Sequence, residues 1–139
     1  MPKVAWNDSL SIGVPEIDAQ HQRLFALVNE VDEAIQARHG AEIAARALRT
    51  LCDYAVEHFA AEEALMDMNT YADYDRHMAA HMDGTTKALE FLQAVDEDKN
   101  VDMPAFLAYL ALWVEEHIMD VDQGLGRYLR AAGNTAPAE

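Results

Sequence analysis

Four long stretches of this chain repeat apolar residues at alternating steps of three and four, which is the period of an amphipathic α-helix. The first stripe holds Ile17, His21, Leu24, Val28, Val31 and Ile35, and the second holds Leu48, Leu51, Ala55, His58, Glu62 and Leu65. The third holds His77, His81, Ala88, Leu92 and Val95, and the fourth holds Phe106, Leu110, Trp113 and His117. No stretch alternates with the period of two that a β-strand requires. The pattern therefore predicts an all-α protein of four helices.

Start and stop signals place the ends of these helices. Pro15 precedes the first stripe and the pair His39-Gly40 closes it, while the third helix is expected from about Ala72 to Val95. The polar run 96–100 reads as a solvated loop, and Asp102 is an expected N-cap ahead of Pro104. Short polar links favour an antiparallel, up-down-up-down four-helix bundle.

Length and charge limit the domain organisation and the partners. With 139 residues, 51% of them hydrophobic, we expect one domain over 1–139, with an arm (1–14), a bundle (about 15–130) and a short C-terminal tail (about 131–139). The formal net charge of -15 argues against nucleic acid and anionic membrane surfaces as partners. The first ten residues contain no apolar run for export or membrane insertion, so the cytoplasm is the expected location. The single cysteine, Cys52, is expected to be a small packing residue.

Five of the six histidines lie inside the apolar stripes. His58 and Glu62 are four residues apart, as are His77 and His81, so each pair projects from one face of its helix. His21 and His117 come from the other two helices. The sixth, His39, lies beside Gly40 at an expected helix end and serves as an internal control.

A single core histidine is often satisfied by a neighbouring hydrogen bond, but five in one bundle are difficult to satisfy without a metal, because each neutral ring carries both a donor and an acceptor. Imidazole and carboxylate ligands suit zinc, iron, copper or nickel, and the lack of clustered thiolates disfavours structural zinc and iron–sulfur sites. One tetrahedral zinc ion cannot use five histidines. Two metal ions bridged by carboxylates can.

These segments resemble the hemerythrin family, in particular its single-domain bacterial members. The resemblance rests on the run from Ile17 to His21, the segment from His58 to Glu63, the His77 and His81 pair, and His117-Ile118 followed by Asp122, with Trp6 in the arm. It implies two non-haem iron ions with a bridging oxo or hydroxo group. It also implies that one iron is bound by His77, His81 and His117, that the other is bound by His21 and His58, and that Glu62 and Asp122 bridge them.

Asp122 is the residue that helix geometry alone would not select. Five residues advance a regular helix by about 140° beyond a full turn, so Asp122 should point away from His117 while Asp120 lies closer to its face. The family pattern selects Asp122, and a widened π-type turn near Gly124 would bring it inward.

Three acids near the expected ligands have other predicted roles. Glu63 and Glu116 adjoin ligands but face about 100° away, and both are expected to be solvated. Asp18 is either an exposed acid at the helix start or a partner that orients an imidazole.

The resemblance also implies a function. With a bridging hydroxide, the three-histidine iron has six ligands and the two-histidine iron five, which leaves one open position for a small neutral ligand. Dioxygen is the expected ligand, and reversible binding for carriage, storage or supply is the expected function, rather than catalysis. The alternatives are a di-iron oxidase, an enzyme that handles peroxide or nitric oxide, and an oxygen or iron sensor. The sequence does not identify a redox or oxygen-accepting protein partner.

Overall fold

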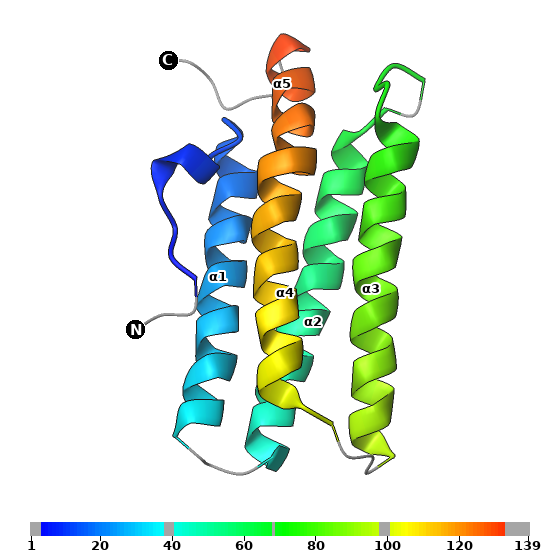
Figure 1. Cartoon of the computed structure of the whole chain (residues 1–139). Coiled ribbons are helices and arrows are strands. Elements are labelled where there is room, and N and C mark those ends of the chain that lie inside the picture. Colours follow the sequence, from blue (N-terminus) through cyan, green and yellow to red (C-terminus); the bar gives the residue numbers. More distant parts are fainter. Residues whose placement is uncertain (1–3, 38–40, 68, 98–100, 133–139) are drawn as a thin grey trace.

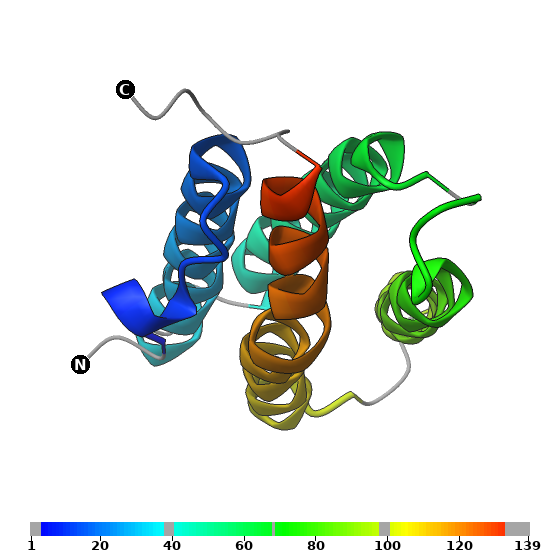
Figure 2. The ribbon, with the colours of Figure 1, turned by 90° about the horizontal axis from the view of Figure 1, so that it is seen from above.

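The computed structural model describes residues 4–37, 41–67, 69–97 and 101–132, and all regular structure in these ranges is helical. The main helices are α1 (Pro15–Gln36), α2 (Ala41–Leu65), α3 (Tyr74–Asp96) and α4 (Met103–Glu116). A π-helix, η2 (His117–Asp122), joins α4 directly to α5 (Gln123–Ala131), so these three segments form the fourth rod of the bundle. Figures 1 and 2 show the four rods running alternately up and down, which confirms the predicted antiparallel four-helix bundle.

The helices begin where the local chemistry favours them. Pro15 occupies the first turn of α1, where a missing N–H is harmless, and α1 starts at this residue. The Asp102 carboxylate accepts a hydrogen bond from the Ala105 N–H at 3.0 Å, which confirms the predicted N-cap of α4. The expected third helix starts two residues late, at Tyr74, after a turn. The expected His39-Gly40 stop signal and the C-terminal tail beyond residue 132 lie outside the described residues, so the division into arm, bundle and tail stays a prediction.

The apolar stripes face one another and form the core. Its fully buried members include Ile17, Val28, Leu48, Leu51, Leu107, Ile118 and Leu125. Cys52 is partly buried and packs against this core, as predicted, and its pKa rises to about 11, because it is buried and because the Asp53 carboxylate lies nearby. No helix in the described part of the chain is long and apolar enough to cross a membrane.

The N-terminal arm is packed against α1 and α5 and contains one 3-10 turn, η1 (Asp8–Leu10). Asp18 holds it to α1, because its carboxylate accepts hydrogen bonds from the Ile12 N–H at 2.9 Å and from the Ser11 hydroxyl. Neither role expected for Asp18 is therefore the one observed. On the other side, a side chain at Gly126 of α5 would overlap the carbonyl oxygen of Ile12, so only glycine permits this close approach. The arm therefore fixes α5, which directly follows Asp122.

Candidate metal centre

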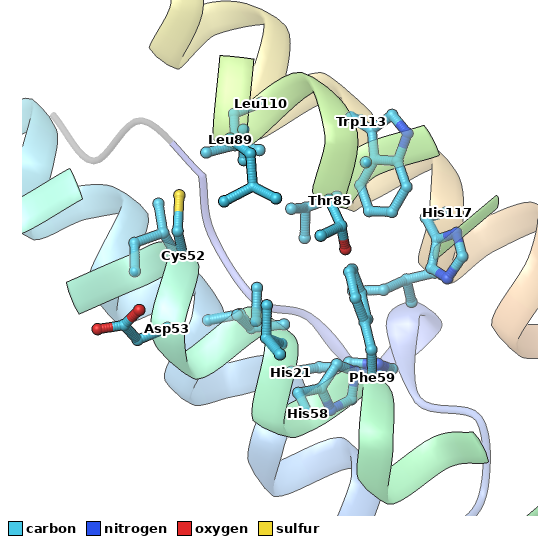
Figure 3. Close-up of a pocket in the computed structure, with 18 of the residues that line it drawn as sticks. His21, Cys52, Asp53, His58, Phe59, Thr85, Leu89, Leu110, Trp113 and His117 are labelled. Carbon is cyan, nitrogen blue, oxygen red and sulfur yellow. The ribbon is translucent and has the colours of Figure 1, made fainter. Parts of the chain in front are cut away.

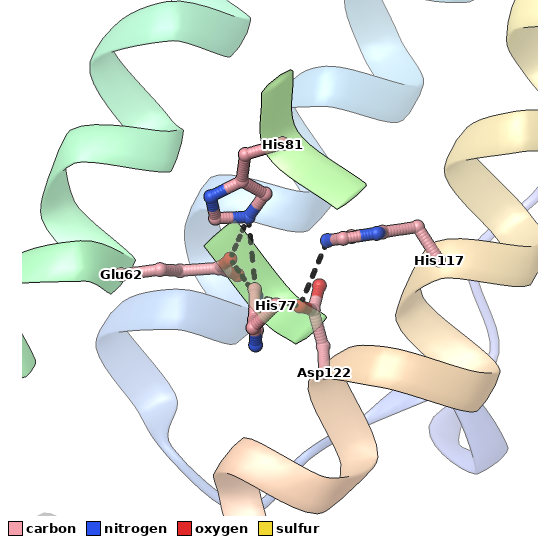
Figure 4. A group of neighbouring side chains, drawn as sticks. All are labelled: Glu62, His77, His81, His117 and Asp122. Carbon is pink, nitrogen blue, oxygen red and sulfur yellow. Dashed lines mark hydrogen bonds and ion pairs between the residues drawn. The ribbon is translucent and has the colours of Figure 1, made fainter. Parts of the chain in front are cut away.

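All seven residues expected to bind metal lie together inside the bundle. His21 comes from α1, His58 and Glu62 from α2, His77 and His81 from α3, and His117 and Asp122 from η2. Each is at most 7% exposed to solvent, and Glu62 and Asp122 are completely buried. Figure 4 shows five of them pointing toward one another from three rods of the bundle.

The two oxygen atoms of Glu62 face two different sets of imidazoles. Its Oε1 lies 3.2 Å from Nε2 of His77 and 3.0 Å from Nε2 of His81. Its Oε2 lies 3.1 Å from Nε2 of His21 and 2.9 Å from Nε2 of His58. The carboxylate therefore lies between the histidines of α3 on one side and those of α1 and α2 on the other.

Asp122 divides the histidines in nearly the same way. Its Oδ1 lies 3.1 Å from Nε2 of His77 and 3.2 Å from Nε2 of His117, and its Oδ2 lies 3.0 Å from Nε2 of His21. Two overlapping groups result, whose ligand atoms lie within 4.8 Å of one another: Glu62, His77, His81, His117 and Asp122 in one, and His21, His58, Glu62 and Asp122 in the other. The two carboxylates belong to both groups.

The π-helix explains how Asp122 reaches this position. Its hydrogen bonds span five residues instead of four, so residues five apart, such as His117 and Asp122, come close to one face. The widened turn expected near Gly124 is therefore present, just before that residue. Asp120, the alternative from regular helix geometry, is exposed.

The buried charges shift the pKa values of the residues that face them. Burial alone would lower the pKa of His21, but contacts with the carboxylates of Asp122 and Glu62 raise it to about 9. The same opposing causes raise the pKa of His77 to about 9. Burial would raise the pKa of Glu62, but its contacts with the imidazoles hold it well below the usual range. Burial and the charge of Glu62 would raise the pKa of Asp122, but its contacts with His117 and His21 lower it. Both carboxylates are therefore anions, and protonated histidines or bound cations must balance their charge.

Two polar side chains contact the outward-facing nitrogens of the histidines. Nδ1 of His58 lies 2.6 Å from Oε1 of Gln20, and Nδ1 of His81 lies 2.9 Å from Oε2 of Glu63. Such partners fix the orientation of an imidazole whose other nitrogen faces a metal. The prediction that Glu63 is solvated is therefore wrong in the main point: the side chain is 32% exposed, but its carboxylate holds His81. Glu116 is exposed, as predicted.

Aromatic rings stack on two of the histidines. Phe59 stacks on His81 with ring centroids 4.1 Å apart and planes at 13°, and Trp113 stacks on His117 at 4.6 Å and 10°. The indole of Trp113 lies against Gly84 of α3, where an added Cβ would be only 2.7 Å from its Cζ2. Glycine at this position leaves room for the ring that covers His117.

An apolar cavity of about 90 Å³ reaches the cluster from between α2, α3 and α4. Figure 3 shows His21, His58 and Phe59 on one side of it, with Thr85, Leu110 and Trp113 across from them. His21, His58, His117 and Asp122 line the cavity, whereas His77 and His81 do not. The cavity therefore meets the cluster mainly on the side of His21 and His58.

Sequence and structure comparisons place this arrangement in a known family. Residues 12–129 match the family model described as the hemerythrin HHE cation binding domain. A bacteriohemerythrin of Pseudomonas aeruginosa is 30% identical over 124 residues, which cover 89% of this chain and 80% of the relative. A hemerythrin-like protein of Naegleria gruberi is 29% identical over an alignment that covers 84% of this chain and 86% of the relative. A crystal structure of a hemerythrin mutant superposes with a TM-score of 0.83 at 26% identity, and the match covers 91% of this chain and 97% of that one. The chain belongs to the hemerythrin family.

Proposed function

We propose that this protein binds dioxygen reversibly at a pair of non-haem iron ions held by the seven clustered residues. The observation that carries the proposal is the division of the two carboxylates between two sets of histidines. The Oε1 and Oε2 atoms of Glu62 face different sets, and so do the Oδ1 and Oδ2 atoms of Asp122. A carboxylate that bridges two metal ions has this arrangement.

Unpaired polar atoms in the cluster fit two cations. Nε2 of His117 and both oxygens of Asp122 are buried and form no aligned hydrogen bond with any described residue, although they lie within ion-pair distance of neighbours. Leaving such groups unpaired in a dry interior costs free energy, and cations would satisfy them. His77, His81 and His117 would hold one ion, His21 and His58 the other, and Glu62 and Asp122 would bridge them.

The two sides of the cluster are unequal. Because one side has three histidines and the other two, the ion beside His21 and His58 would have one protein ligand fewer, and this is the side that the apolar cavity meets. A ferrous pair with a bridging hydroxide would supply the electrons that reversible dioxygen binding requires. Phe59 and Trp113, which stack on His81 and His117, also line this cavity and would keep water, and therefore protons, away from the open position.

Oxygen binding is preferred to an enzymatic function because the cluster has five histidines and only two carboxylates, those of Glu62 and Asp122, that face their Nε2 atoms. Di-iron enzymes that activate oxygen in helical bundles use carboxylate-rich sites with Glu-x-x-His repeats. This chain has no such repeat. The cytoplasmic location expected from the sequence stays a prediction.

An optical cycle on the iron-loaded protein tests the function. Protein reduced without oxygen should be nearly colourless, gain a visible charge-transfer band in air, and lose that band when argon displaces the oxygen. If air converts the reduced protein irreversibly on first contact, the carrier function is wrong and an oxidase or a peroxide-handling enzyme becomes the better hypothesis.

A pair of histidine variants tests the site that this function requires. His58→Ala should lose or weaken the two-histidine ion, since it leaves the buried charges of Glu62 and Asp122 poorly compensated. His39→Ala is the matched control and should retain both the iron and the optical band. Equal losses in the two variants, measured by metal analysis, would contradict the assignment.

A further inference from the structure

The cavity beside the cluster is longer than dioxygen requires. On α2 its lining extends from Leu51 to Phe59, on α3 from Gly84 to Leu92, and on the fourth rod from Leu110 to Asp122. Eight residues of helix rise by about 12 Å, so the lining is roughly 12 Å long on α2 and on α3. Its volume of about 90 Å³ corresponds to roughly six to nine water-sized spheres, at about 10–15 Å³ each. A row of this length matches an unbranched chain of about six to eight carbons, whereas dioxygen has two atoms.

The walls of the cavity are hydrocarbon along this length. Away from the histidines they are formed mainly by aliphatic side chains, which include Leu24, Leu51, Ala55, Ala88, Leu92, Leu110 and Val114. No lysine or arginine lines the cavity. A charged group inside would therefore be desolvated without a partner, so the occupant must be apolar along its buried part.

The cavity meets solvent between α2 and α3. Val56 of α2 and Leu89 of α3 line it there and are 51% and 60% exposed. Asp53, an exposed carboxylate of α2, also lines the cavity, and Figure 3 places it beside Cys52. Both the Asp53 carboxylate and the net charge of -15 disfavour an anionic head group at this opening.

We propose that this cavity binds the alkyl chain of an unbranched amphiphile that carries no negative charge, namely a medium-chain alcohol. The alkyl chain lies along the aliphatic walls, and the hydroxyl group stays at the opening between Val56 and Leu89. The proposal rests on the proposed function only in placing the dioxygen site where the cavity meets His21 and His58. The binding site itself is defined by the cavity walls.

A series of primary alcohols from 1-propanol to 1-decanol tests this proposal, with heats of binding measured by titration on the air-oxidised protein as purified. Each added methylene should tighten binding by about fourfold while it is still buried by the cavity. The gain should stop near six to eight carbons, where the chain fills the available length. Affinity that rises evenly to 1-decanol, or no saturable binding of 1-hexanol, would overturn the proposal.

Variants localise the binding to the cavity. Ala88→Leu fills it from α3 and should weaken 1-hexanol binding at least about tenfold, since several methylenes lose their place. Ala55→Leu fills it from α2 and gives the same test if the first variant does not fold. Ala108→Leu makes the same change at an exposed position of α4 and should bind 1-hexanol like the unchanged protein. Equal affinity in the cavity variants and the control would place the alcohol elsewhere. This titration does not depend on oxygen binding and the optical cycle uses no alcohol, so either hypothesis can fail alone.

Discussion

Stripping the metal with a chelator should leave His21 and His77 protonated at neutral pH. Burial lowers the pKa of both imidazoles, but the carboxylates of Asp122 and Glu62 raise it from 6.5 to about 9. A metal ion must displace these protons. At pH 7 each displacement opposes binding by about 2.7 kcal/mol, since one pKa unit corresponds to about 1.4 kcal/mol. Metal affinity should therefore rise with pH, by up to about tenfold per pH unit for each proton, until the pH approaches 9.

The same shifts set the pH dependence of stability without metal. A raised histidine pKa stabilises the fold fully below pH 6.5, and this stabilisation disappears as the pH rises from 6.5 to about 9. For one histidine the shift corresponds to about 3 kcal/mol, and the two contributions are not additive because both depend on the same carboxylates. The lowered pKa of Glu62 acts in the opposite direction, because its contribution is lost as the pH falls below the ordinary value of 4.5. The metal-free protein should therefore be most stable between about pH 5 and pH 6.5.

An NMR titration of the imidazole resonances in the chelator-treated protein measures these pKa values directly. Asp122→Asn removes one of the two anions that face His21 and His77 and should lower both pKa values. Asp120→Asn removes an exposed carboxylate of the same π-helix and should leave them unchanged. Titration of both imidazoles near 6.5 in the unchanged protein, or equal effects of the two variants, would refute the reasoning.

Five further substitutions, one of them a control, test the centre and its surroundings. Asp122→Ala should impair binding of the metal pair while Asp120→Ala retains it, as measured by metal analysis; the reverse order would make Asp120 the ligand. Glu63→Gln should weaken metal affinity by about tenfold in competition with a chelator, and an unchanged affinity would show that its contact with the imidazole is unimportant. Gly126→Val should lower the free energy of unfolding by about 2 kcal/mol in urea, because the new side chain overlaps the arm, and an unchanged midpoint would mean that the arm is not packed there. Trp113→Ala should speed oxidation of the oxygen-bound protein in air, and a rate equal to that of the parent would show that the ring does not exclude water.

The helical period of the apolar residues is sufficient to predict the helices and to show that most of the metal-binding side chains point inward. Each of the five clustered histidines occupies a position where an apolar residue would continue the stripe, and this made them visible as a group. Asp122 was different. Regular helix geometry pointed to Asp120, and only the family pattern selected Asp122, because no local rule predicts where a helix widens into a π-turn.

The contacts that support the centre were harder to predict. Glu63 faces about 100° away from Glu62 on α2, a direction that predicts solvent exposure, yet His81 on the neighbouring helix presents Nδ1 to that side. Gln20 of α1 contacts His58 of α2, and the helical pattern does not predict this contact. Both residues adjoin expected ligands in the sequence, so adjacency to a ligand was the available signal. Asp18 holds an arm, a contact that leaves no periodic trace in the sequence.

An anomalous difference map from crystals of iron-loaded protein, collected at the iron absorption edge, tests the central claim most directly. We expect two peaks per chain, both between the carboxylates of Glu62 and Asp122. One peak should lie against His77, His81 and His117, and the other against His21 and His58. A single peak, or ions bound away from the two carboxylates, would contradict the di-iron centre.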